Sequence, residues 1–544
     1  MISRTRFIAL LLLFCCTLPA AAQKPKLVVG VVVDQMRWDY LYRYQDRYIA
    51  DGFKRLLREG FSCENTLIPY TPTYTAPGHT CVYTGSVPSL HGIVGNNWYS
   101  RELGRSVYCT EDDSVQTVGS TSTAGKQSPR NMWASTITDE LRLANNFTGK
   151  TIGIALKDRG AILPAGHTAN AAYWFDNASG GFITSTFYMQ QLPQWVQQFN
   201  GRKLPDQYLK GNWKTLFPLN TYRQSTADDK PYEGRLNGED NAFDHITESL
   251  TNNRYDVFRH TPWGNSYTFE MAKAAIEGEQ LGTGKATDFL ALSFSSPDYI
   301  GHTFGPNSIE VEDTYLRFDR EFATFLKYLD QKIGKGQYLL FLTADHGVAH
   351  VPAFAQEHKI PGGVTTERNL RQRLNDALQQ EFNTANIVLT IYNDQVFLNN
   401  DVVAKAGLNR SAVKTSIIRE LLKTGAVSKA FDLESINAAN LPEKLHMMVV
   451  NGYNQRLSGD VQYIYKPQWF DGGTTGTTHG LWNPYDSHIP LVWFGWNIKP
   501  GKLNRETYMT DIAPTLAAML QVQMPNANIG HVITEITSSQ PAAK

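Results

Sequence analysis

Residues 27–34 read LVVGVVVD, an apolar run that stops at an aspartate. Residues 338–345 read YLLFLTAD and repeat the arrangement, with Asp345 at the end of a second apolar run. An uninterrupted apolar run of this length is typical of a strand that is buried on both faces, as in a parallel sheet covered by helices. The two stretches therefore predict a central parallel sheet with polar residues at the carboxyl ends of its strands.

Strand-like and helix-like segments alternate along the rest of the chain. Further short apolar runs lie at Thr151–Leu156, Phe289–Phe294 and Ile489–Phe494. Helical periodicity is found at Tyr48–Arg58, Met132–Leu143, Val311–Leu329 and Thr510–Leu520. This alternation predicts an α/β fold in which a largely parallel central sheet is sandwiched by helices. Because such sheets place their sites at the carboxyl ends of the strands, we expect the functional residues there.

Two long stretches interrupt this alternation. Residues from about 180 to 270 are rich in aromatic, Asn, Gly and Pro residues and suggest a loop-heavy excursion over the site. Residues from about 355 to 470 contain an amphipathic segment at Ser411–Leu422 and strand-like segments at Asn386–Tyr392 and Val461–Tyr465. We interpret both as insertions in one catalytic domain over residues 23–544, because His479 completes a residue pattern that begins before the second stretch.

The amino terminus has the pattern of a secretory signal peptide. Two arginines precede the apolar run Phe7–Cys16, and small residues follow at Ala20–Ala22. The run is shorter than the roughly 20 residues of a membrane span. We therefore expect residues 1–22 to be removed from a secreted, periplasmic protein. The alternative, a lipid on Cys15 or Cys16, is disfavoured because the two preceding residues are large.

Charge and cysteine content narrow the functional classes. The whole chain carries 51 basic and 51 acidic residues, and loss of the signal peptide would remove only two arginines. Such a balance argues against bulk nucleic-acid binding, which needs a concentrated basic surface. Cys63, Cys81 and Cys109 remain after the signal peptide. One disulfide with a free thiol is an open alternative, and the spacing does not fix a pairing.

Six candidate metal-binding side chains stand out, five of them close after predicted strands and His479 in a loop. They are Asp34, Asp298, His302, Asp345, His346 and His479. Asp298 and His302 are four residues apart, so both side chains would face one ion if the segment is helical. Each residue also has a plain structural reading, as a helix cap, an exposed helix-start pair or a turn histidine. Together, however, three carboxylates and three imidazoles suit zinc better than calcium or magnesium, and their number suggests two ions.

With these residues the sequence resembles the alkaline phosphatase superfamily. Within it, the chain is most similar to the nucleotide pyrophosphatase/phosphodiesterase-like branch and to the PafA-type bacterial alkaline phosphatases. The resemblance rests on residues in the family's order: Asp34, Thr73–His79, Gly95–Trp98, Lys157–Arg159, Asp298 with His302, Asp345–His346 and His479. It spans most of the chain after the predicted signal peptide.

The resemblance implies a role for each motif residue. One zinc would be held by Asp298, His302 and His479, and the other by Asp34, Asp345 and His346 together with the Thr75 oxygen. Thr75 would be the nucleophile and form a phosphothreonine, since coordination to a metal stabilises its alkoxide. Asn96 would donate to a nonbridging phosphoryl oxygen. His79, His350 and His488 are candidates for orienting the ligands.

Lys157 and Arg159 bear on the substrate class. They are two residues apart, so on an extended segment their side chains would share a face. Their two positive charges would favour a phosphate monoester dianion over a diester, which carries one negative charge less. We therefore predict a zinc-dependent alkaline phosphatase that acts on small phosphate monoesters, scavenges inorganic phosphate and works as a monomer.

Other functional classes remain as alternatives. The first is a phosphodiesterase or nucleotide pyrophosphatase on the same fold. A sulfatase is disfavoured because Thr75 stands where that branch has cysteine or serine, and a phosphoglycerate mutase because those enzymes are not secreted and use serine. A zinc- or phosphate-binding protein without activity is disfavoured because every matched motif residue is present.

Overall fold

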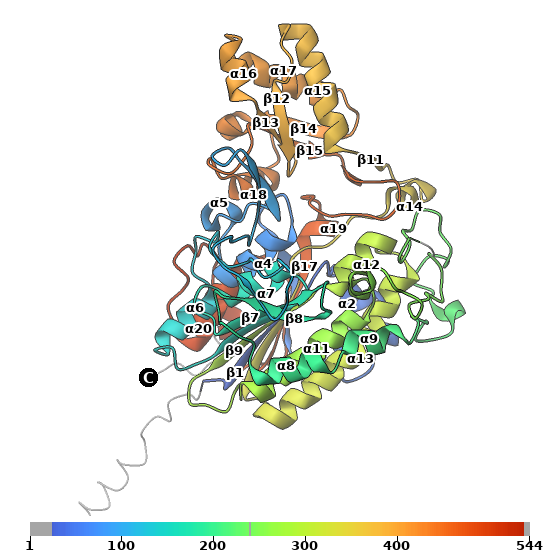
Figure 1. The fold of residues 1–544 in the computed structure, drawn as a ribbon, viewed down its shortest axis with the longest axis vertical. Helices are drawn as coiled ribbons and strands as arrows, with labels where there is room; N and C mark the ends of the chain where they lie inside the picture. The colour runs from blue at the N-terminus through green and yellow to red at the C-terminus, as the bar shows by residue number, and fades with distance from the viewer. Residues whose placement is uncertain (1–23, 239–240, 538–544) are drawn as a thin grey trace, which may run out of the picture.

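The computed structural model describes residues 24–238 and 241–537, so the predicted signal peptide lies outside the described residues. Its centre is a sheet whose middle strands are parallel (Figure 1). These strands are, in spatial order, β10 (Tyr338–Thr343), β1 (Leu27–Val33), β9 (Asp288–Phe294), β6 (Thr151–Ala155) and β7 (Ala171–Asp176). The α/β fold with a largely parallel sheet is therefore confirmed.

Antiparallel strands flank this parallel centre. The predicted strand at Ile489–Phe494 is β17 (His488–Gly495), which pairs antiparallel with β10, and β2 (Phe61–Leu67) pairs antiparallel with β17. On the far side, β8 (Gly181–Ser185) runs antiparallel to β7. The shorter strands β5 (Thr117–Val118), β18 (Gly501–Leu503) and β19 (Thr507–Tyr508) complete the sheet.

Helices cover both faces of the sheet, as the alternation predicted. On β9, Phe294 packs against Phe269 of α11 (Trp263–Gly278), with ring centroids 4.4 Å apart. Phe289, on the opposite face of the same strand, packs against Tyr83 of α4 (Thr75–Thr84). The layer with α11 also contains α13 (Ile309–Leu329), and the layer with α4 contains α7 (Asp158–Ala165) and α20 (Ile512–Leu520) (Figure 1). The strands therefore have apolar side chains on both sides.

Three predicted helices begin later than the sequence pattern suggested. The helix predicted at Tyr48–Arg58 is α3 (Phe53–Glu59), because Asp319 of α13 accepts the Phe53 N–H and fixes the start there. The helix predicted from Met132 is α6 (Ile137–Ala144), which begins at a capping box of Thr136 and Asp139. A short 3-10 turn precedes α20, so that helix starts at Ile512.

The two interrupting stretches differ in how they pack. The first contains α8 (Gln194–Gly201), α9 (Leu204–Leu209) and α10 (Arg254–Arg259), and its apolar side chains join the main core. Trp213 of this stretch is buried, and its indole N–H donates to Asp313 of α13 over 2.8 Å. The first stretch is thus fastened to the helical layer beside the sheet.

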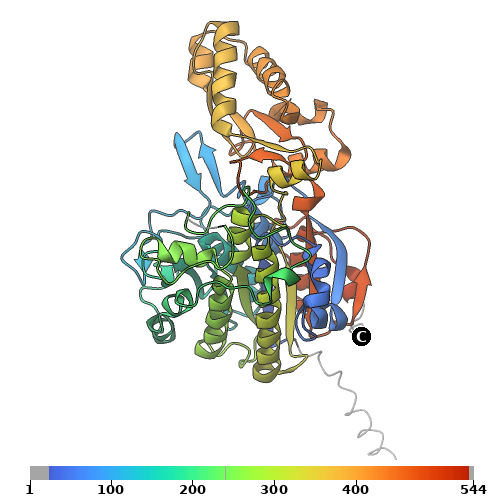
Figure 2. The ribbon, with the colours of Figure 1, turned by 90° about the vertical axis from the view of Figure 1, so that its right-hand side faces the viewer.

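The second stretch forms a separate lobe, visible at the top of Figures 1 and 2. We call residues 363–471 the inserted lobe. Its antiparallel sheet has the order β12 (Val388–Tyr392), β13 (Gln395–Leu398), β15 (Val461–Tyr465) and β14 (Val427–Asp432). Helices α15 (Glu367–Phe382) and α17 (Arg410–Leu422) pack on this sheet around an apolar cluster distinct from the main core.

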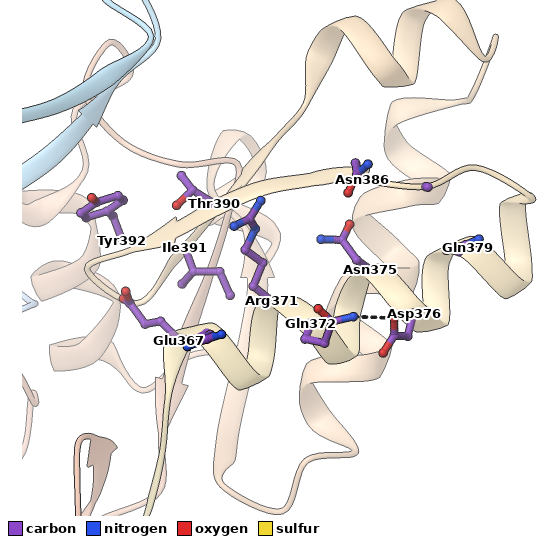
Figure 3. A pocket seen from close by; sticks show the side chains of 12 residues that line it. Glu367, Arg371, Gln372, Asn375, Asp376, Gln379, Asn386, Thr390, Ile391 and Tyr392 are labelled. Atoms are coloured by element: carbon purple, nitrogen blue, oxygen red, sulfur yellow. Dashed lines mark hydrogen bonds between the residues drawn. The ribbon is translucent and has the colours of Figure 1, made fainter.

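A polar groove lies in the lobe between α15 and β12 (Figure 3). It has a volume of about 520 Å³ and is lined by side chains that include Arg371, Asn375 and Tyr392. None of its lining residues is among the predicted site residues. The groove is therefore separate from the chemistry expected at the sheet edge.

The structure also bears on two further points from the sequence, disulfide pairing and a membrane-spanning helix. Cys63, Cys81 and Cys109 are buried free thiols, so the disulfide left open by the sequence is not formed among them. They sit on separate elements, β2, α4 and the segment after β4 (Arg105–Tyr108). Within the described residues, no helix is long and apolar enough to span a membrane.

Candidate metal centre

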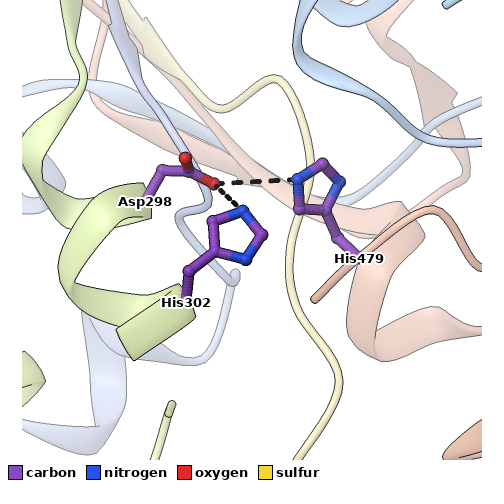
Figure 4. A group of neighbouring side chains, drawn as sticks. All are labelled: Asp298, His302 and His479. Atoms are coloured by element: carbon purple, nitrogen blue, oxygen red, sulfur yellow. Dashed lines mark ion pairs between the residues drawn. The ribbon is translucent and has the colours of Figure 1, made fainter. Parts of the chain in front are cut away.

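Six candidate metal-binding side chains meet at the carboxyl ends of β1, β9 and β10. In the first group, Asp298, His302 and His479 point toward one another (Figure 4). Helix α12 (Ser296–Phe304) carries Asp298 and His302 four residues apart on one face, as the spacing predicted. His479 comes from the loop that follows the inserted lobe. The His302 and His479 Nε2 atoms lie 3.1 and 3.7 Å from the Asp298 Oδ1 atom.

The second group consists of Asp34, Asp345 and His346. Asp34 directly follows β1, and Asp345 and His346 follow β10 after one residue. The His346 Nε2 atom lies 3.5 Å from Asp34 Oδ1 and 3.4 Å from Asp345 Oδ2. The two groups adjoin, because the rings of His346 and His479 stack with centroids 3.5 Å apart.

The spacing of the side chains in both groups is compatible with a bound zinc ion. Two ligands of one tetrahedral zinc ion, each about 2.0–2.1 Å from the metal, are roughly 3.3 Å apart. The ligand separations in both groups lie close to this value.

The orientation of the histidine rings supports the same conclusion. Each of the three ligand histidines uses Nδ1–H to donate to a backbone carbonyl: His302 to Thr477, His346 to Gly347 and His479 to Thr73. The Nε2 atoms then lie on the side of the carboxylates, and histidines that bind a metal through Nε2 are oriented in the same way.

The charges of the site also call for a cation. Asp34 and Asp345 are buried, and within the described residues the Asp34 Oδ1 and Asp345 Oδ2 atoms accept no hydrogen bond. Burial, together with the charges of Asp298 and Asp345, raises the pKa of Asp34 well above its usual range. Burial and the neighbouring His346 and His302 hold the pKa of His479 well below its usual range, so its imidazole is neutral. Buried carboxylate oxygens without a hydrogen bond, beside a neutral imidazole, fit a divalent metal.

Lys157 supplies part of the compensating charge. Its ammonium lies between the groups, 2.6 Å from Asp34 Oδ2 and 2.5 Å from Asp298 Oδ2. Burial lowers the pKa of Lys157, but Asp298 and Asp34 raise it further, and the net shift is upward. Lys157 therefore keeps a positive charge at the point where the two groups meet.

Thr75 and Asn96 stand beside the second group. Thr75 is the first residue of α4, and its Oγ1 atom lies 3.3 Å from His346 Nε2. The Asn96 Oδ1 atom accepts the Ala76 N–H over 2.8 Å. This bond orients the Asn96 amide so that its NH₂ group is available to a ligand next to Thr75.

The expected extended segment at Lys157–Arg159 is wrong. Lys157 caps α7, and Arg159 already belongs to the helix, because Asp158 Oδ1 accepts the Arg159 backbone N–H at the first turn. The two side chains therefore make different contacts. Lys157 reaches the carboxylates, whereas Arg159 donates to the Tyr108 hydroxyl over 3.0 Å.

Gln35 was not singled out from the sequence, although it follows Asp34 directly. Its backbone N–H donates to Asp345 Oδ1 over 3.1 Å, and its side-chain amide donates to Asp298 Oδ1 over 2.7 Å. Gln35 thus connects ligands of both groups. A Cβ atom on Gly301 would overlap the Gln35 Oε1 atom, which explains a glycine between Asp298 and His302.

The three candidate orienting histidines occupy different places. His79 Nδ1 donates to the Thr75 carbonyl over 2.9 Å and lies 3.3 Å from Asp345 Oδ2, while Nε2 is 2.8 Å from Ser293 Oγ. In contrast, His350 bonds Asn307, and His488 bonds the Glu64 carbonyl. Of the three, His79 is the one whose described contacts reach Thr75 and a carboxylate of the site.

Comparison with known proteins defines the family. The profile of the type I phosphodiesterase / nucleotide pyrophosphatase family matches residues 28–486, and the chain belongs to this family. It is 53% identical to alkaline phosphatase PhoV of Synechococcus elongatus over 95% of this chain and 94% of that protein. A protein of Myroides odoratus named calcium-transporting ATPase is also 53% identical, over 94% of this chain and 95% of its own.

The chain is also similar to a protein of known structure. Alkaline phosphatase PafA of Elizabethkingia meningoseptica is 48% identical over 95% of each chain. A crystal structure of PafA superimposes with a TM-score of 0.92, covering 95% of this chain and 99% of that one. The resemblance seen in the sequence is thus confirmed in both sequence and fold.

We predict that Gly301→Ala weakens divalent metal binding. The added methyl group displaces the Gln35 amide and frees Asp298, and loss of such a supporting contact costs about 10–100-fold in metal affinity. Zinc affinity would be measured by competition with a chromogenic chelator. Gly201→Ala is the matched control, because a Cβ there meets no atom within 4 Å. Equal zinc affinity in the two variants would contradict this role of Gln35.

Proposed function

We propose that this protein is an exported, zinc-dependent alkaline phosphatase that hydrolyses phosphate monoesters. One observation carries the proposal: Thr75 lies at the start of α4 beside two adjoining groups of zinc-type ligands. The similarity to PhoV and PafA, both named alkaline phosphatases, supports the substrate class. Export rests on the signal-peptide pattern of residues 1–22.

Two zinc ions are the cofactor that we infer. Asp298, His302 and His479 would hold one, and Asp34, Asp345 and His346 the other, together with Thr75 Oγ1. When bound, the pair would supply Lewis-acid stabilisation of the attacking and leaving oxygens.

The chain's own residues would carry out a two-step transfer. Thr75 would lose its hydroxyl proton to solvent, and its Oγ would attack phosphorus as the bond to the ester oxygen breaks. The alcohol would leave with a proton from solvent. Water then attacks the phosphothreonine, which releases inorganic phosphate and restores Thr75. The Asn96 NH₂ group would stabilise a nonbridging oxygen.

The preference for monoesters would come from Lys157 and Arg159. Both are cationic, and each raises the positive potential beside Thr75, which favours a dianionic phosphoryl group. Phosphodiester hydrolysis is the second candidate, because the family profile that matches the chain is described as a phosphodiesterase and nucleotide pyrophosphatase profile. A diester carries one negative charge less, so these two residues would stabilise its transition state less.

Thr75→Ala is predicted to abolish steady turnover without unfolding the protein. The substitution removes the nucleophilic hydroxyl but leaves the six carboxylate and imidazole ligands in place. We expect kcat for an aryl phosphate to fall by at least about 10⁴-fold, with the thermal unfolding midpoint nearly unchanged. Thr75→Ser keeps a hydroxyl and is the matched control. Near-normal turnover of Thr75→Ala would refute the nucleophile assignment.

Lys157→Ala and Arg159→Ala are predicted to change substrate preference. Loss of one charged donor to a transferring group costs about 10²–10³-fold, and we expect that loss in kcat/KM for the monoester. For a diester with the same leaving group the loss in kcat/KM should stay below about tenfold. A diester carries one negative charge less, so it gains less stabilisation from these cations. Arg58→Ala, at an exposed arginine, is the control. An equal loss on both substrates would refute the argument that these two charges select the monoester.

A further inference from the structure

A β-hairpin joins the inserted lobe to the residues proposed to hold the phosphoryl group. It consists of β3 (Asn97–Ser100) and β4 (Arg105–Tyr108). Asn96 lies at its first end, and the Cys109 N–H at its second end donates to the Asn96 carbonyl over 3.0 Å. The base of the hairpin therefore fixes the backbone of Asn96.

The second end of the hairpin reaches Arg159. The Tyr108 hydroxyl donates to Asp158 Oδ1 over 2.5 Å and accepts from Arg159 Nη1 over 3.0 Å. Within the described residues, the Arg159 Nε atom has no hydrogen-bond partner, so Tyr108 is the contact that directs this guanidinium. A single hairpin thus touches both Asn96 and Arg159, which lie on different parts of the chain.

The tip of a lobe hairpin contacts the start of β3. Asn393 lies in the two-residue turn between β12 and β13, and its side-chain amide donates to the Asn97 carbonyl over 2.8 Å. A Cβ atom on Gly95 would lie 2.5 Å from this amide nitrogen. Glycine at residue 95 therefore permits the lobe to approach the segment that carries Asn96.

Side chains on the hairpin strengthen this contact. Tyr99 packs edge-on against Phe397 of β13, with ring centroids 5.6 Å apart. Arg101 donates to Asp460 over 2.9 Å and to the Ser458 carbonyl over 2.6 Å, and it also covers the Phe397 ring. In Figure 2 the light-blue hairpin rises toward the orange lobe. Aromatic, ionic and backbone contacts thus hold the hairpin against the lobe.

From these contacts we propose that the inserted lobe, acting through the β3–β4 hairpin, positions Asn96 and Arg159 for phosphoryl binding. Asn393 and Tyr108 are the positioning residues: Asn393 acts through Asn96, and Tyr108 acts through Arg159. The inference rests on the proposed function, since it assigns the lobe a part in recognising the phosphoryl group of that reaction. It follows that changes in the lobe alter substrate binding without touching the metal ligands.

The first test removes the Tyr108 hydroxyl in two backgrounds. Tyr108→Phe should lower kcat/KM for an aryl phosphate monoester about tenfold in the wild-type protein, the size of one lost hydrogen bond to a charged group. In an Arg159→Ala background the same change should cost less than about twofold, because the group through which Tyr108 acts is gone. Tyr328→Phe is the control, since that hydroxyl bonds Glu277 on the protein surface.

The second test removes the Asn393 amide while keeping its turn. Asn393 has φ +55°, which glycine adopts freely, so Asn393→Gly preserves the backbone. It should lower kcat/KM severalfold in the wild-type protein and have little effect with Asn96→Ala. Asn386→Gly is the matched control, because Asn386 also has a positive φ and lies in the same lobe. Inhibition by inorganic phosphate should weaken in parallel with kcat/KM.

The outcomes separate this inference from the proposed function. The positioning role is overturned if Tyr108→Phe lowers kcat/KM as much in the Arg159→Ala background as in the wild type. The same holds for Asn393→Gly in the Asn96→Ala background. Either result would leave the phosphatase assignment standing. Wild-type rates for both single variants would overturn the positioning role as well. If Arg159→Ala and Asn96→Ala themselves leave monoester hydrolysis unchanged, their proposed roles fail, and the inference fails with them. Zinc content of each variant, measured in parallel, should equal that of the wild type.

Discussion

The structure depends on three buried carboxylates that meet at one edge of the sheet. Asp34, Asp298 and Asp345 follow three adjacent parallel strands, so the pairing of those strands forces their charges together. Burial of like charges is costly unless cations compensate them. Lys157 provides one positive charge, and each of the three histidines uses its Nδ1 atom on a backbone carbonyl. The remaining compensation is what divalent metals would supply, and the proposed chemistry uses the same ions.

This constraint also explains the supporting contacts. Gln35 links carboxylates of both groups, and His79 links Thr75 to Asp345 and Ser293. Gln35 lies in the turn directly after β1 and His79 lies in α4, and both are buried, so packing holds their side chains in place. In the proposed function, recognition of the phosphoryl group would rest on Asn96 and Arg159, and the hairpin that connects them contacts the inserted lobe. We therefore propose that different parts of the chain support the two functions. The sheet and its helices hold the metal ligands, and the hairpin and the inserted lobe position the phosphoryl-binding residues.

The sequence predicted the sheet well and the surroundings of the site less well. Apolar runs such as Leu27–Val33 indicate buried strands, because a strand covered on both faces needs apolar side chains on both faces. Helix starts were misplaced where a distant side chain decided them, as Asp319 does for α3. The candidate metal-binding pattern was readable because five of its six residues follow a strand or have helical spacing, and His479 was the loop residue that completed it. Tyr108 and Asn393 gave no such signal, since their contacts lie 51 and 296 residues away along the chain.

The most direct test of the account is anomalous X-ray diffraction at the zinc edge from crystals of the purified protein. The account predicts two anomalous peaks per chain, one within about 2.1 Å of ligand atoms of Asp298, His302 and His479, and one equally close to those of Asp34, Asp345 and His346. A single peak, or peaks away from these side chains, would contradict a two-zinc centre. The Thr75 oxygen should then be found next to the second peak.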